Sequence, residues 1–312
     1  MKAPDYLSPD ELATFTERSD LQGAWLVLRN WLLVGAIFTV VTVWTNPLTI
    51  VLGIVFLGGQ QLGLSILMHE AGHKTLFKTQ RLNELVGQWL CAFPVLGDCD
   101  AYAASHREHH RLAGTHDDPD LPNYENYPIS KSSFKRKILR DVTGRTGIKL
   151  LAGLFSGIGN RAMMREGEGN GALSRGLLAN AALFLLLWLI GVPALYLLWV
   201  LSYLTSYLLV ARIRQLAEHG NVAALYDEDP RGNTRTTRAN WLERLVFAPN
   251  NVNYHTEHHL LPSTPSWQLR SLHNALVAKG FYADHPHAVA NSYWDVITHA
   301  VPALARRDAA TT

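Results

Sequence analysis

The sequence predicts an all-α integral membrane protein with four transmembrane helices in two hairpins and a helical cytosolic cap that carries three histidine-rich motifs. We expect a single domain over residues 1–312. Three observations predict this class: two long apolar stretches, a lack of basic residues in the turns expected within them, and histidine motifs that follow the spans. The net charge of +2 gives no reason to expect a nucleic-acid partner.

The first apolar stretch predicts two spans, at about 24–44 and 47–68. Each is long enough to cross a hydrocarbon core, which takes about 20 residues of helix. Only Thr45-Asn46 separates them, so we expect a tight hairpin. The polar exceptions Gln60, Gln61 and Ser65 lie near the far end of the second span, and such groups are expected to face the protein interior or a cavity rather than lipid.

The second apolar stretch, Gly176 to Ala211, is too long for one span. As a single helix it would extend about 54 Å, whereas the hydrocarbon core is roughly 30 Å thick. Gly191-Val-Pro193 interrupts it near the middle. We therefore expect a second hairpin, with spans at about 176–190 and 194–211.

Basic residues indicate which side of the membrane each segment faces. None of the 28 lysines and arginines lies in Thr45-Asn46 or in Gly191 to Pro193. Because basic loops stay on the cytosolic side, both termini and the segments 69–175 and 212–312 are expected to be cytosolic. All three histidine motifs then lie on the same side, at the cytosolic ends of spans.

Three shorter segments have no transmembrane role in this topology. Leu85 to Gly97 and Ile148 to Gly159 are apolar but too short to span, so we expect them to be interfacial or re-entrant. Lys131 to Lys149 is basic. It either lies against anionic headgroups or forms a solvated charged face.

The three motifs are His69-Glu-Ala-Gly-His73, His106-Arg-Glu-His-His110 and His255-Thr-Glu-His-His259. On a helix, these spacings place the imidazoles on one face. Imidazole is a ligand for iron, zinc and copper, and eight of them exceed the four ligands of a tetrahedral zinc. The pattern therefore predicts two metal ions. The eight candidate ligands are His69, His73, His106, His109, His110, His255, His258 and His259.

A ninth candidate ligand, His219, lies just beyond the last span. Gln215 is one helical turn earlier on the same face, so it is a further candidate, binding a metal directly or through water. These ligands are all neutral, which leaves a metal pair electrophilic and suits activation of O2. The other histidines match no motif, and we expect structural or surface roles for them. They are His116, His273, His285, His287 and His299.

Acidic residues near the motifs are candidate hydrogen-bond acceptors for the imidazole N–H groups that metal ligation leaves free. The aspartates that follow the second motif have an alternative role, as a polar loop that ends a helix. The candidates are Glu70, Glu108, Asp117, Asp118, Asp120, Glu218 and Glu257.

Two other classes of protein compete with an oxygen-activating enzyme. His69-Glu-Ala-Gly-His73 matches the zinc metalloprotease pattern, in which Glu70 would be the general base. A zinc intramembrane protease needs one further protein ligand, which leaves six motif histidines without a role. A metal transporter needs polar residues along its spans, whereas these ligands cluster outside them.

From about Leu64 to Leu272 the chain resembles the membrane-bound fatty acid desaturase superfamily, with its histidine boxes. The segments that carry this resemblance are the three motifs, the stretch from His106 to Asp120, and the segments 212–220 and 252–262. Within the superfamily, Asn233-Thr-Arg-Thr-Thr237 most resembles a bacterial subgroup that includes the rhizobitoxine-type desaturase.

The resemblance implies a di-iron centre held by the nine histidines. It implies O2-dependent removal of hydrogen from an unactivated C–H bond of a fatty acyl or other lipid-like chain, with hydroxylation as the alternative outcome. It also implies two electrons from a separate ferredoxin or small cytochrome with its reductase. Family members often have Asn where this chain has Gln215, which leaves the ligand role of Gln215 open.

A lipid chain can enter such a site by sliding from the bilayer into a tunnel between the spans. The metals would then lie where the tunnel meets the cytosol. The second and fourth spans carry the side chains expected to line it, which are Gln60, Ser65, Tyr203, Thr205 and Tyr207.

Overall fold

The computed structural model of the chain describes residues 2–156 and 169–304. In this part the protein is helical apart from one pair of two-residue strands, β1 (Thr236–Thr237) and β2 (Val289–Ala290), which are parallel. The predicted all-helical class is thus confirmed. The small strand pair was not predicted, because two residues are too few to show a periodic pattern.

Four helices in the described part of the chain are long and apolar enough to cross a membrane. They are α2 (Asp20–Val43), α3 (Pro47–Gly72), α8 (Gly169–Leu189) and one continuous helix formed by α9 (Ala194–Ser202), a π-helical turn (Tyr203–Tyr207) and α10 (Leu208–His219). The four predicted spans are therefore present as helices.

Two of these helices continue beyond the ends predicted for the spans. α3 runs past Met68, and α10 runs past Ala211. The predicted ends were set by the first polar side chains, but those side chains have partners inside the protein. Glu70 accepts hydrogen bonds from Thr75, for example, and Arg212 pairs with an aspartate. The helices therefore extend into the region that holds the histidines.

Local sequence explains the two turns between these helices. At the start of α3, the Asn46 side chain accepts hydrogen bonds from the backbone N–H groups of Leu48 and Thr49, and Pro47 occupies the first helical position. Between α8 and α9, Gly191 has a φ of +84°, in the left-handed region that favours glycine. The predicted break at this position is confirmed.

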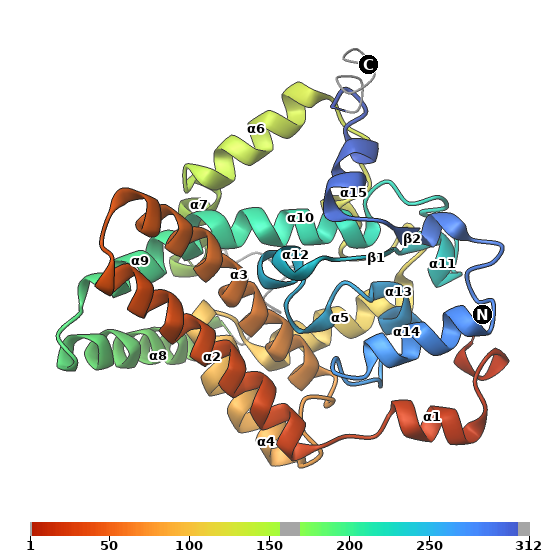
Figure 1. Cartoon of the computed structure of the whole chain (residues 1–312), viewed down its shortest axis with the longest axis horizontal. Helices are drawn as coiled ribbons and strands as arrows, with labels where there is room; N and C mark the ends of the chain where they lie inside the picture. Colours follow the sequence, from red (N-terminus) through yellow and green to blue (C-terminus); the bar gives the residue numbers. More distant parts are fainter. Residues whose placement is uncertain (1, 157–168, 305–312) are drawn as a thin grey trace.

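Shorter helices make up the rest of the described protein. They are α1 (Pro9–Phe15), α4 (Gln80–Val86), α5 (Cys99–Leu112), α6 (Lys131–Val142), α7 (Arg145–Phe155), α11 (Pro230–Asn233), α12 (Trp241–Val246), α13 (His255–Leu260), α14 (Leu269–Ala278) and α15 (Tyr293–Ala300). In Figure 1, α2, α3, α8 and α9 lie on the left, α11, α13, α14 and the strands lie on the right, and α10 runs from one group toward the other.

The two weaker apolar stretches do not form long helices. Leu85 to Gly97 contains a π-helical turn, Gly87–Ala92, and a 3-10 turn, Phe93–Val95. Ile148 to Gly159 contributes most of α7, and residues 157–159 lie outside the described part. The basic segment from Lys131 to Lys149 forms α6 and the first half of α7.

Side chains on the two sides of the long helices differ in their exposure. Leu57, Leu62 and Trp199 are almost fully buried between them. Their outward faces carry exposed apolar side chains such as Leu28 and Leu186, as expected for helices surrounded by lipid. Further exposed apolar side chains on α2, α3 and α8 include Trp25, Leu32, Val40, Leu48, Val51, Leu178, Phe184 and Trp188.

Amide side chains connect α3 to its neighbours. Asn30 on α2 donates to the backbone carbonyl of Gln60 at 3.1 Å, and Gln60 donates to the carbonyl of Leu245 at 3.1 Å. Gln61 donates to the carbonyl of Trp199 at 2.9 Å. These hydrogen bonds help to fix the register of α3 against the elements around it.

The close approach of α3 to the π-helical turn generates a first prediction. A Cβ atom at Gly58 would lie 2.4 Å from Ser206 Oγ and 2.7 Å from the backbone nitrogen of Tyr207. Gly58→Ala should therefore lower the stability by about 1–3 kcal/mol through overpacking. Gly35→Ala on α2 is the control, because apart from its own helix no described atom lies within 4 Å of the added Cβ. Thermal unfolding in detergent compares them; equal melting temperatures would contradict this packing.

Candidate metal centre

The nine candidate histidines come from four elements that meet at one place. His69 lies in the last turn of α3 and His73 caps that helix. The second motif occupies the last turns of α5, His219 is the final residue of α10, and the third motif forms most of α13. Both α3 and the continuous helix formed by α9 and α10 therefore end at the same site.

These histidines form two groups, within each of which the candidate ligand atoms lie within 4.8 Å of one another. The first group has five members, His69, His73, His106, His110 and His258. The second has four, His109, His219, His255 and His259. The structure therefore brings together all nine histidines singled out from the sequence, and it divides them into two sets.

Four Nε2 atoms of the first group form a closed ring. Those of His69 and His106 are 2.8 Å apart, those of His106 and His110 3.0 Å, those of His110 and His258 2.9 Å, and those of His258 and His69 3.0 Å. Each Nε2 offers either one proton or one lone pair. At most half of these contacts are therefore hydrogen bonds.

This ring has the dimensions of a metal site. A flat ring with these sides has its centre about 2 Å from each nitrogen, the length of a bond between imidazole and a metal ion. In the second group, the Nε2 atoms of His219 and His255 are 2.8 Å apart. The Nε2 atoms of His73 and His259 are buried without a hydrogen-bond partner in the described part of the chain. The donors present thus fit two cations.

Burial favours the neutral form, which is the form that binds metal, in six of the motif histidines that lie outside the spans. It lowers the pKa of His73 to about 4, with a further contribution from the charge of Arg107. For five motif histidines on α5 and α13, burial and then the neighbouring imidazoles lower the pKa well below its ordinary value. This holds for His106, His110, His255, His258 and His259.

Hydrogen-bond acceptors orient two of the imidazole rings from the side that faces away from the histidine groups. In each ring, Nδ1 carries the proton and Nε2 points toward the other histidines of its group. Nδ1 of His109 donates to Asp118 at 2.8 Å, and Nδ1 of His219 donates to the backbone carbonyl of Asn233 at 3.1 Å. Asp118 also accepts a hydrogen bond from Tyr124, whose ring stacks on His219 with centroids 4.7 Å apart.

Three other predicted acceptors also lie beside the groups. Glu70 Oε1 is 3.3 Å from Nδ1 of His69, and Glu218 Oε1 is 3.5 Å from Nδ1 of His255. Asp120 lies 3.9 Å from Nδ1 of His109, and burial raises its pKa.

The remaining predicted acceptors are placed differently. Asp117 is exposed, and Glu108 pairs with Arg111 at 2.7 Å on the exposed side of α5. Glu257 is fully buried on the far side of α13, where it accepts a hydrogen bond from Nδ1 of His273 at 2.5 Å and from two hydroxyl groups. Glu257 therefore holds α13 against α14 rather than orienting a motif histidine directly.

A cavity of about 560 Å³ borders both groups. It reaches from the histidines along α3, α7, α8 and α10. Its lining includes His106, His109, His219 and His255 at one end, together with Leu62, Val95, Leu150, Leu154, Leu173 and Leu208. Gln215 also lines it. This volume falls in the range of ordinary small-molecule sites.

The predicted lining is correct in part. Ser65, Tyr203 and Tyr207 line the cavity, and Ser65 and Tyr207 are hydrogen-bonded at 2.9 Å. Gln60 does not, because its side chain is bonded to a backbone carbonyl between helices. Thr205 also lies outside the lining and donates to the carbonyl of Leu201. The π-helical turn changes which side chains face inward here, and such turns are common at functional sites.

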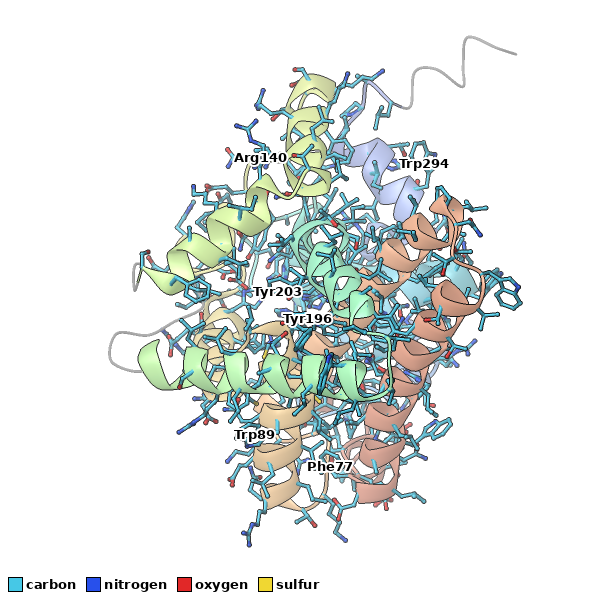
Figure 2. The ribbon with its side chains drawn as sticks, turned by 90° about the vertical axis from the view of Figure 1, so that its left-hand side faces the viewer. Phe77, Trp89, Arg140, Tyr196, Tyr203 and Trp294 are labelled. Carbon is cyan, nitrogen blue, oxygen red and sulfur yellow. The ribbon has the colours of Figure 1, made fainter. Side chains whose placement is uncertain are left out.

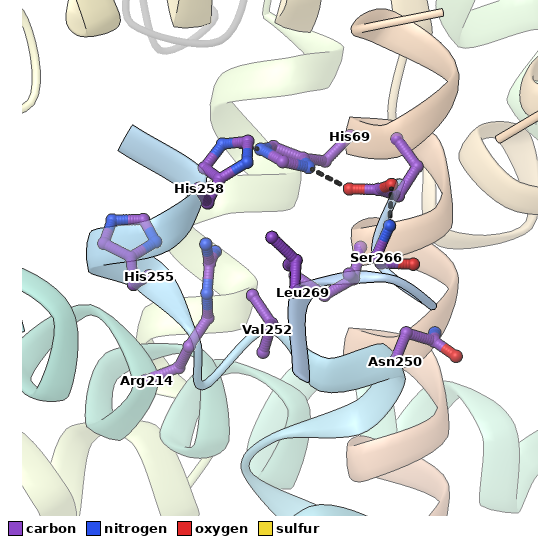
Figure 3. A pocket seen from close by; sticks show the side chains of 10 residues that line it. His69, Arg214, Asn250, Val252, His255, His258, Ser266 and Leu269 are labelled. Carbon is purple, nitrogen blue, oxygen red and sulfur yellow. Dashed lines mark hydrogen bonds and ion pairs between the residues drawn. The ribbon is translucent and has the colours of Figure 1, made fainter. Parts of the chain in front are cut away.

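A second, very small cavity of about 10 Å³ lies behind the first group. Figure 3 shows His69, His258, Arg214 and Ser266 around it. This is roughly the space of one water molecule. Glu70 borders it and accepts hydrogen bonds from the backbone of Ser266 at 2.8 Å and from the Thr75 hydroxyl at 3.0 Å.

Comparison with known proteins agrees with this geometry. A family model for fatty acid desaturases matches residues 42–291. The chain is also 30% identical over 274 residues to the dihydrorhizobitoxine desaturase of Bradyrhizobium elkanii, an alignment that covers 80% of this chain and 74% of that protein. The chain belongs to the fatty acid desaturase family.

A second desaturase relative is similar over a shorter region. The sn-1 acyl-lipid omega-3 desaturase (ferredoxin) of Nostoc sp. (strain 36) is 29% identical over 125 residues, which cover 40% of this chain and 33% of that protein. The family predicted from the histidine motifs is confirmed, and the Bradyrhizobium relative agrees with the predicted bacterial subgroup.

Sequence reasoning missed several residues at this desaturase site. Tyr102 stacks on His106 with centroids 5.1 Å apart, and its i, i+4 spacing on α5 was an available signal. Tyr124 and the carbonyl of Asn233 reach the site from loops and a short helix. Nothing in a single sequence shows such long-range contacts.

The contact between His109 and Asp118 generates a second prediction. Asp118→Asn removes the negative charge that holds the Nδ1 proton, so the second group should bind metal about 10- to 100-fold more weakly. Equilibrium dialysis against buffered Fe(II), followed by elemental analysis, measures this. Asp117→Asn, at the exposed neighbouring position, should bind like the wild type. Equal losses in both variants would argue against the orienting role of Asp118.

Proposed function

We propose that this protein is an O2-dependent di-iron desaturase that acts on an unactivated C–H bond of a fatty acyl or other lipid-like chain. The observation that carries the proposal is the pair of all-histidine groups at one end of a largely apolar cavity. Iron suits imidazole ligands, and the family is generally iron-dependent. In this proposal the nine histidines hold two iron ions.

Two iron ions bound there would supply oxygen activation and removal of hydrogen from carbon. In the overall reaction the chain loses two hydrogen atoms, and two more electrons and two protons enter from outside. Together these reduce one O2 to two molecules of water and leave a carbon–carbon double bond. Because half of the electrons come from outside, the enzyme needs a separate donor, a ferredoxin or a small cytochrome with its reductase.

The protein's own residues prepare this reaction. The apolar cavity wall binds a hydrocarbon chain and excludes water from its reacting carbon. His106, His109, His219 and His255 bring the histidine groups to the cavity surface. The acceptor Asp118 keeps the ring of His109 oriented, and the Glu218 carboxylate lies 3.5 Å from Nδ1 of His255, so these two rings are held before the reaction begins.

We further propose that the whole chain, residues 1–312, is a single multi-pass membrane domain in which the four spans form two hairpins. The absence of lysine and arginine from both short turns supports this arrangement. The histidine groups then face the cytosol at the inner membrane surface, where a soluble electron donor reaches them.

The names of the relatives support desaturation over hydroxylation. One is named for dihydrorhizobitoxine and the other for an acyl lipid, with ferredoxin in its name. A lipid-like substrate and a ferredoxin donor are therefore our proposal for this chain.

A zinc protease fits the geometry poorly. Its general base would need a carboxylate free to act on water beside the metal. One oxygen of Glu70 instead accepts hydrogen bonds from Thr75 and Ser266, and the other lies 3.3 Å from Nδ1 of His69, on the side of that ring away from the Nε2 atoms of the group.

The proposal predicts that His109→Ala abolishes oxidation while the protein still folds in membranes, because it removes one of four donors from the second group. Mass spectrometry of lipids from cells that make each variant measures new double bonds. His116→Ala is the control, since His116 is exposed and stacks on Tyr226 away from both groups. Retained turnover in His109→Ala would contradict the proposal.

A further inference from the structure

The cavity has a charged feature at a distance from the histidines. Arg212, Gln215 and His219 lie on one face of α10, at i, i+3 and i+7, and all three line the cavity. Seven residues of α-helix correspond to about 10 Å. The backbone of Arg212 is therefore about two helical turns from that of His219, and its side chain lines the cavity.

A buried aspartate holds this arginine in place. Arg212 donates from Nε to Asp141 Oδ2 at 2.5 Å and from Nη2 to Oδ1 at 3.0 Å. Asp141, on α6, is fully buried and also accepts a hydrogen bond from the Thr146 hydroxyl at 2.6 Å. This two-point contact fixes the guanidinium plane.

The arginine keeps donors beyond those that Asp141 uses. A guanidinium has five N–H groups, and Asp141 takes two of them. Nη1 of Arg212 has no hydrogen-bond partner among the described residues. An ionisable side chain within or beside a membrane-spanning segment is energetically costly to bury, and such residues often mark substrate sites.

Two leucines that line the cavity lie close in sequence to Arg212 on α10 and to Thr146 on α7. Leu208 lies one turn earlier on α10, and Leu150 lies one turn after Thr146 on α7, and both line the same cavity. The cavity thus presents an oriented cation, an apolar wall and, about 10 Å along α10, the histidine groups. A hydrocarbon chain with one anionic end matches this order of features.

We propose that Arg212 binds the carboxylate end of the substrate and thereby sets which carbon lies beside the histidines. The inference rests on the proposed function and narrows its substrate class to amphiphiles whose anionic oxygen lies about 10 Å from the oxidised carbon. Asp141 acts as a positioning residue that presents the free edge of the guanidinium to the cavity.

The test uses binding, so that it is independent of turnover. Radiolabelled dodecanoate and methyl dodecanoate are the probes, and the full-length iron-loaded protein in detergent is the receptor. The wild type should bind dodecanoate at least about tenfold more tightly than its ester, as expected for a charge-assisted contact. In Arg212→Met this preference should disappear, with the affinity for the ester unchanged.

Two further variants distinguish binding of the substrate carboxylate by Arg212 from a purely structural contact between α6 and α10. Arg140→Met removes an exposed arginine of α6 and should keep the wild-type preference (Figure 2). Arg212→Met with Asp141→Leu replaces the buried pair by apolar side chains, which keeps the interior free of an unpaired charge should the single variant fail to fold. It too should lose the preference.

Two results would overturn the inference: no preference for the carboxylate in the wild type, or an equal loss of affinity for both probes in the Arg212 variants. Oxidation of the bound probes, assayed separately with a ferredoxin donor, tests the proposed function. If the protein prefers dodecanoate but oxidises neither probe, the inferred carboxylate site stands and the proposed desaturase function is contradicted.

Discussion

The constraint behind this structure is a set of Nε2 atoms that face one another across 2.8 to 3.0 Å, although at most half of these contacts can be hydrogen bonds. Water does not relieve the repulsion, because most of these rings are buried. An unpaired buried polar atom costs about 1–3 kcal/mol. Two cations, one per group, would satisfy these lone pairs together, so the fold and metal binding are expected to be strongly coupled.

The long helices explain how that site is positioned. α3 and α10 are each continuous from the apolar layer to the histidines, so His69 and His219 are rigidly placed relative to the spans. The shorter α13 depends instead on Glu257, which ties it to α14. The same continuity of α10 places Arg212 and the histidines on one wall of the cavity.

Much of this architecture was predictable, because it depends on periodic patterns and on local composition in the sequence. The four apolar helices, the break at Gly191 and the family followed from such patterns. The ends of α3 and α10 did not, because polar side chains such as Glu70 continue a helix when tertiary partners bind them. Nor does spacing distinguish Asp118, which contacts His109, from exposed Asp117. Only the path of the loop decides between them.

Anomalous X-ray diffraction from crystals of the iron-loaded protein, measured at the iron absorption edge, tests the central claim most directly. The account predicts two iron peaks, one in each histidine group. The first lies among the nitrogens of His69, His73, His106, His110 and His258, and the second among those of His109, His219, His255 and His259. A single peak, or iron bound away from these histidines, would contradict it.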